Sequence, residues 1–147
     1  MRVEGFVQRK SRRRGNALIE FSLCVPWLFF LFVGASDLGF FCYDLVAVQD
    51  AARVAALYTS QSSSTASDST GACTYVLKEL QDIPNVKSLA TCTASPLTVT
   101  ATAVTASDGK PASQASVTYA SPQLIPIPGV LSGQYTWTRS VTMALQN

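Results

Sequence analysis

The sequence predicts an α+β protein with a long N-terminal membrane-spanning helix, followed by a small antiparallel β-sheet module with a short helix. Two patterns support this fold class. An early segment is almost entirely apolar, and later segments alternate apolar and polar residues with the period of half-buried strands. The composition agrees, because 147 residues with 48% apolar and 14% charged residues are too few for two large domains and poor in charge for a soluble protein.

The predicted membrane span begins at Ala17. Between residues 17 and 35 the only charged residue is Glu20. A helix of this length would cover roughly 30 Å, the thickness of the hydrocarbon core of a bilayer. If the helix continues over residues 16–58, it is about 65 Å long, so half of it must project from the membrane.

Charge is distributed unevenly on the two sides of this segment. Six of the eleven Lys and Arg residues lie in the first fifteen positions, together with one acid, so residues 1–15 carry +5 and the rest of the chain −3. The positive-inside rule therefore places the N-terminus in the cytoplasm and the C-terminal part outside. Beyond Gly15 the chain lacks the interleaved basic and aromatic residues of a nucleic-acid-binding face, so no nucleic-acid partner is expected.

A motif stands where the basic leader meets the apolar segment. The leader, residues 1–15, ends in Gly15, and Glu20 and Phe21 occupy the fifth and sixth positions counted from Asn16. This arrangement resembles the processing site of type IV pilin precursors, whose cut would fall between Gly15 and Asn16.

Residues further along the chain make the resemblance specific to one family of pilins. Pro26 lies in a Leu- and Phe-rich run, residues 34–39 read Gly-Ala-Ser-Asp-Leu-Gly, and residues 51–56 read Ala-Ala-Arg-Val-Ala-Ala. Over residues 13–58 the chain resembles the TadE-like minor pilins (pseudopilins) of the tight-adherence (Tad/Flp) type IV pilus system. The resemblance implies a pilin-like fold and a minor pilin subunit that takes part in assembly, priming or tip structure of a pilus used in adhesion.

The same resemblance implies partners and a location. The partners would be a prepilin peptidase, other pilin subunits, the pilus assembly machinery and, before assembly, membrane lipid. The protein would be a single-pass inner-membrane protein that reaches the cell surface in the pilus.

Glu20 and Phe21 would register the subunits, with Glu20 pairing with the free α-amino group of Asn16 on a neighbouring subunit. The alternative for Glu20 is an interaction with the free amides at its own helix N-terminus.

Two other interpretations of the N-terminal segment remain. Small residues at 33–35 would allow signal-peptide cleavage before Ser36, but a helical apolar stripe continues through this point from Phe41 to Ala55. Alternatively, the protein is a signal-anchored envelope module for binding or adhesion that is not incorporated in a fibre.

Two segments follow the long helix. Residues 59–70 are rich in Ser and Thr and predict a linker or surface loop, either flexible or glycosylated. The extracytoplasmic α+β module is expected over residues 71–147. It begins with a short amphipathic helix from about Ala72 to Asp82, which Pro84 follows.

Three alternating runs predict the sheet. The first spans residues 97–103, including Ala103 on its apolar face, and the second spans 114–119, with an Asp108-Gly109 turn between them. The third spans 135–145, where Arg139 interrupts the apolar face. The apolar, proline-rich connection over residues 121–133 is expected to cover the sheet edge or the helix, or to form an exposed contact patch.

The four cysteines predict one disulfide. Cys73 and Cys92 both fall on the oxidising side of the membrane and are expected to pair, the alternative being two reduced core residues. Cys24 and Cys42 lie about 27 Å apart on one helix, far beyond the roughly 7 Å limit between bridged α-carbons, and cannot pair with each other.

Catalytic chemistry has little support in the sequence. The chain contains no His, which removes the commonest metal ligand and the commonest neutral-pH base. The acids are scattered, and no Gly-rich phosphate loop is present. We therefore expect neither an enzyme nor a cofactor or metal site.

Overall fold

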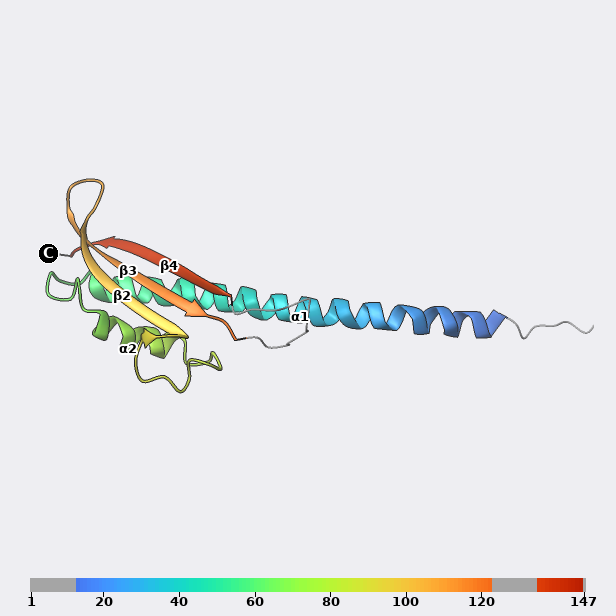
Figure 1. Cartoon of the computed structure of the whole chain (residues 1–147). Coiled ribbons are helices and arrows are strands. Elements are labelled where there is room, and N and C mark those ends of the chain that lie inside the picture. Colours follow the sequence, from blue (N-terminus) through green and yellow to red (C-terminus); the bar gives the residue numbers. More distant parts are fainter. Residues whose placement is uncertain (1–12, 123–134, 147) are drawn as a thin grey trace, which may run out of the picture. The chain divides into compact units, whose positions relative to one another are not determined.

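The computed structural model describes residues 13–122 and 135–146. Its elements, in order, are α1 (Arg13–Thr59), α2 (Ser69–Glu79), β1 (Thr93–Ala94), β2 (Leu97–Thr105), β3 (Pro111–Ala120) and β4 (Thr136–Ala144) (Figure 1). The predicted α+β class is confirmed, because a long apolar helix precedes a small antiparallel sheet and a short helix. The expectations for residues 1–12 and for most of the 121–133 connection lie outside the described residues.

The chain divides into two compact units, residues 1–38 and 39–147. The described part of the first unit is the beginning of α1, which continues through Pro26 without a break. Its large apolar side chains are exposed, Trp27 at 74% and Leu23 at 73% among them. Exposure of so many Leu and Phe side chains to water is costly, whereas lipid accepts them. In the described part of the chain, α1 is the one helix long and apolar enough to cross a membrane, over Ala17–Thr59.

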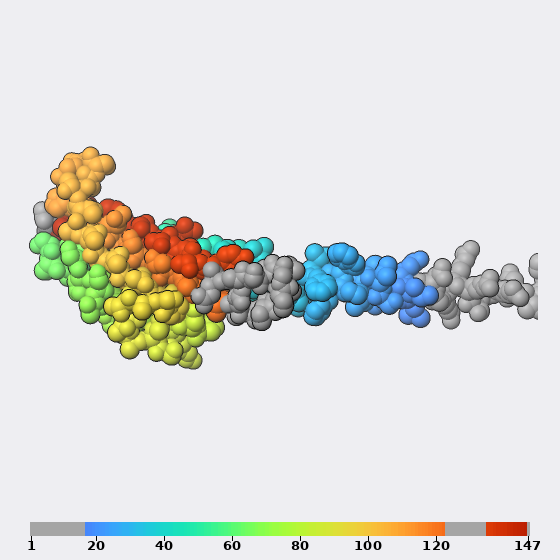
Figure 2. Space-filling model, viewed as in Figure 1, coloured from blue at the N-terminus to red at the C-terminus, as the bar shows by residue number. Residues whose placement is uncertain are grey.

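The second unit contains a four-stranded antiparallel sheet in the order β1-β2-β3-β4. β2 and β3 form the predicted hairpin, in register from Leu97↔Tyr119 to Thr105↔Pro111. Gly109 in the connecting turn has a φ of 80°, a conformation that glycine adopts without steric cost. The turn projects from the rest of the sheet, in orange in Figures 1 and 2. The two-residue strand β1 was not predicted, since it is too short to show a period.

The core of the second unit lies between the sheet, α2 and the second half of α1. Both alanine pairs of α1, at 51–52 and 55–56, are fully buried in it, as is Val48. The sheet contributes Leu97, Val117 and Tyr119. The small side chains therefore face the packed interface, as expected for a helix that a sheet approaches closely.

Two strands, β2 and β4, refine the predicted alternation. Ala103 was expected on the buried face but is exposed, because β2 extends past the core toward the projecting turn. In β4, Trp137, Val141 and Met143 pack partly buried against the core, and Arg139 is exposed between them.

The Ser/Thr-rich segment, predicted to be a linker or surface loop, is a loop with defined contacts rather than a flexible connection. Ala66 is buried, and its carbonyl oxygen accepts a hydrogen bond from the Ser113 hydroxyl of β3 at 2.9 Å. The Thr65 hydroxyl also donates to the carbonyl of Ser62 at 3.0 Å. Hydroxyl side chains satisfy the turning backbone here, so a polar sequence forms a defined loop.

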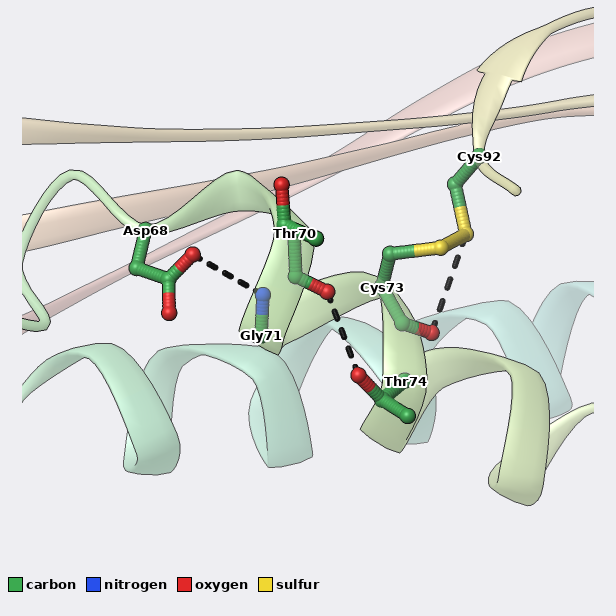
Figure 3. The surroundings of a disulfide bond; sticks show 6 residues. All are labelled: Asp68, Thr70, Gly71, Cys73, Thr74 and Cys92. Carbon is green, nitrogen blue, oxygen red and sulfur yellow. Dashed lines mark hydrogen bonds between the residues drawn. A yellow bond between two sulfur atoms is a disulfide. The ribbon is translucent and has the colours of Figure 1, made fainter. Parts of the chain in front are cut away.

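Helix α2 begins three residues before its predicted start because Asp68 caps it. The Asp68 carboxylate accepts from the Gly71 amide at 2.9 Å and from the Tyr58 hydroxyl at 2.7 Å. The Gly71 amide, followed by the Tyr58 hydroxyl, lowers the pKa of Asp68. The cap thus joins the end of α1 to the start of α2 (Figure 3 shows Asp68 and Gly71).

This cap makes Gly71→Ala a test of packing. Alanine normally stabilises a helix by about 1 kcal/mol relative to glycine. At Gly71, however, a Cβ would overlap the Tyr58 ring and hydroxyl and the Asp68 carboxylate. We expect the substitution to lower the free energy of unfolding by about 1–3 kcal/mol through overpacking, measured by urea denaturation.

The matched control for Gly71→Ala is Thr74→Ala on the exposed side of the same helix. Thr74 makes a single side-chain hydrogen bond within the described residues, to the carbonyl of Thr70 at 3.2 Å. Its replacement should change stability by no more than about 0.5 kcal/mol. A Gly71→Ala protein as stable as the wild type would contradict the packing at this cap.

Candidate processing and subunit-contact segment

The predicted cleavage position lies inside the first turns of α1. The helix begins at Arg13, three residues before its expected start at Asn16, so the Gly15–Asn16 bond is helical and does not mark a coil-to-helix junction. One helical glycine costs only about 1 kcal/mol, which neighbouring good helix formers such as Arg offset. A peptidase that needs an extended backbone would have to unwind this first turn.

Glu20 and Phe21 lie further along the same helix. Both side chains are exposed, Phe21 at 64%. Within the described residues Glu20 has no side-chain hydrogen bond and no ion pair. The structure therefore places the two predicted registration residues on the outside of α1, available to another molecule.

The predicted disulfide is present between Cys73 and Cys92. The two Cα atoms are 5.7 Å apart, within the usual range for a bridge. The bond ties α2 to the segment that leads into the sheet (Figure 3). The Cys92 sulfur also lies 3.7 Å from the carbonyl oxygen of Cys73, a close contact without a hydrogen bond, since a disulfide sulfur carries no proton. Cys24 and Cys42 are free and exposed.

A buried polar cluster joins α1 to the end of β3, and sequence reasoning missed it. The Ser121 hydroxyl donates to the Asp44 carboxylate at 3.1 Å, and the Tyr119 hydroxyl donates to Asn85 Oδ1 at 2.6 Å. The Asn85 amide in turn donates to the carbonyl of Ala120 at 3.0 Å. The signal in the sequence was Asp44 itself, an acid four residues before the core residue Val48 on the same helix face.

Burial of the cluster affects its chemistry. Burial raises the pKa of the Tyr119 phenol, and the nearby Asp44 carboxylate raises it further. Tyr119 thus stays neutral and keeps its hydrogen bond at physiological pH. Its ring packs against Trp137, with centroids 5.6 Å apart, and Trp137 packs against Phe41 at 4.9 Å. The cluster fixes the contact between α1 and the sheet.

Metal binding has no candidate site in the part of the chain that the structure describes. Over residues 13–122 and 135–146, no group of three or more Cys, Asp or Glu side chains is positioned to hold an ion.

These features define a class of protein: a candidate single-pass membrane protein whose long N-terminal helix leads into a small disulfide-bonded α+β module. The family model described as TadE-like protein matches residues 15–57, which is most of α1. The resemblance to the TadE-like family is thereby confirmed for this segment, and it suggests a protein associated with the Tad pilus. Neither the curated proteins nor the solved structures gave a match to the chain.

Proposed function

We propose that this protein is a minor pilin subunit of a Tad/Flp-type pilus, taking part in its assembly, priming or tip structure and used in adhesion. The observation that carries the proposal is the coincidence of the TadE-like match with an apolar span in α1, residues 17–35, that exposes its large apolar side chains around a single acid, Glu20. The role is structural and not enzymatic.

The proposed life cycle has three steps. The basic leader holds the N-terminus in the cytoplasm while α1 spans the inner membrane. A prepilin peptidase then cuts between Gly15 and Asn16, which frees a cationic α-amino group. Finally, the assembly machinery draws the subunit out of the lipid and packs it among other pilin subunits. Its exposed Leu and Phe side chains then exchange lipid for neighbouring helices.

Cleavage is tested by replacing Gly15 with phenylalanine. A peptidase that accepts a small residue beside the cut should reject a bulky one, so we expect the precursor to accumulate at least tenfold in the membrane fraction. Intact-mass measurement and N-terminal sequencing of the membrane form would show whether the protein begins at Asn16. The matched control is Gly34→Ala in the same helix, where a Cβ would meet no atom within 4 Å and processing should be normal.

The same measurement separates the competing functions. A signal-anchored adhesion module that never enters a fibre would retain residues 1–15, whereas a secreted domain would begin at Ser36. Recovery of a wild-type product that still carries the leader, in cells that contain the peptidase, would refute processing at Gly15.

A further inference from the structure

The sheet has a second face, opposite the core, and its composition is unusual. One row across the three long strands consists of Thr98, Thr118 and Thr138, and the next of Thr100, Ser116 and Ser140. We name these two rows the hydroxyl face. All six residues are exposed or partly exposed. The adjacent row continues the pattern, with Gln114 between two threonines.

Hydrogen bonds hold this array in a fixed arrangement. Ser116 and Ser140 share a hydroxyl hydrogen bond of 2.7 Å, and Thr118 and Thr138 share one of 2.8 Å. Each pair uses one proton, so one donor and several acceptor lone pairs per pair stay available. Neighbouring strands in a sheet are about 4.8 Å apart, and every second residue recurs after roughly 6.7 Å. The hydroxyl face is therefore a regular grid of donors and acceptors.

The hydroxyl face also lacks charge. Among the residues of β2, β3 and β4 the only charged one is Arg139, and it pairs with Val117 on the core-facing side. Strand propensity explains threonine at exposed positions, but it does not explain the absence of Lys, Glu and Asp, which commonly occupy about a quarter or more of a protein surface.

Charge and hydrogen-bonding groups on the hydroxyl face restrict the class of partner that it can bind. A nucleic acid or an anionic lipid requires cations, and a protein partner would be anchored by aromatic or Arg side chains, neither of which the hydroxyl face presents. A neutral polymer with many hydroxyl groups matches it, because every sugar hydroxyl is both donor and acceptor like those of Ser and Thr. An extended chain also suits a surface with rows rather than a pocket.

We propose that the hydroxyl face binds a neutral, hydroxyl-rich polysaccharide chain in extended form. The proposal deepens the adhesive role of the proposed minor pilin and rests on it for its biological purpose. The binding itself belongs to the α+β module and does not require a fibre.

The experiment uses the mature full chain in detergent micelles and measures its sedimentation with microcrystalline cellulose, a neutral polymer of extended chains. We expect the triple variant Thr98→Val, Thr118→Val and Thr138→Val to bind at least tenfold more weakly. Valine keeps the shape and strand preference of threonine and removes only the hydroxyl. The matched control replaces Thr70, Thr74 and Thr105 with valine, all exposed and outside the hydroxyl face, and should bind as the wild type does.

A second variant provides an independent test in case the triple variant misfolds. Thr138→Lys alone places a charge at one end of the first row of the hydroxyl face, on the edge strand β4, and should also reduce binding. The proposal would be overturned by equal binding of the wild type and both variants, or by no binding of the wild type to cellulose or to neutral agarose. It would also be overturned if the wild type self-associates and the triple variant does not, because that assigns the face to a second copy. Failure of the minor-pilin function would appear separately, as absence of the wild type from purified pili.

Discussion

Replacement of Glu20 by alanine is expected to give a protein that is inserted and processed normally but is missing from assembled pili. An acid in the apolar part of a membrane helix costs several kcal/mol, so alanine should be easier to insert. The loss should appear only at assembly, where Glu20 would pair with the α-amino group of Asn16 on an adjacent subunit. Fractionation of sheared pili and membranes, with intact mass to show processing, measures the effect, which we expect to exceed tenfold.

Two companion variants separate charge from size in this test. Glu20→Gln keeps the shape of the side chain and removes its charge, and it should fail like alanine. Asp37→Ala removes the other described acid of the first unit and should leave assembly intact. If processed Glu20→Ala protein were recovered with pili at the wild-type level, the carboxylate would have no part in registering subunits.

Removal of the Cys73–Cys92 disulfide is expected to destabilise the α+β module by about 3 kcal/mol, because the bond restricts a denatured loop of about 20 residues in the chain-entropy model. For a module of this size such a loss corresponds to a fall in Tm of roughly 12–24 °C. Thermal denaturation of the Cys73→Ala/Cys92→Ala protein, followed by near-UV circular dichroism, provides the measurement.

Reductant supplies an internal comparison for this variant. Wild-type protein treated with dithiothreitol should unfold at the temperature of the double variant, whereas Cys24→Ala/Cys42→Ala protein should match untreated wild type, since these cysteines are free. Peptide mapping in which both Cys73 and Cys92 alkylate freely without reductant would show that the bond does not form.

Much of the fold could be predicted because its signals are local. The apolar length of α1, the alternation in β2 and β3 and the Asp108-Gly109 turn each lie within one stretch of chain, and the structure confirms them. The order of the Ser/Thr-rich loop was not predictable in this way. It depends on the hydroxyl of Ser113, which is 47 positions from its partner Ala66.

The candidate site was likewise predictable where its signals are local and was missed where it depends on residues distant in sequence. The motif at Gly15, Glu20 and Phe21 is readable from spacing alone, and the structure adds that Glu20 and Phe21 are exposed on α1. The cluster around Asp44 was missed because Asn85, Tyr119 and Ser121 are distant from it in sequence, so the acid marked the position without indicating its partners. If Glu20 pairs with another subunit, as we propose, neither the sequence nor the structure of a single chain contains that partner.

The sheet order has a consequence for the time course of folding. Every strand pairs only with its neighbours in sequence, and folding is fast when contacting residues are near in the chain. We therefore expect α1 to supply a helical surface first, the hairpin of β2 and β3 to close against it next, and β4 to add to an existing edge. No strand has to wait for a distant one or insert between two already paired, so we expect exposed strand edges, which invite aggregation, to be short-lived during folding.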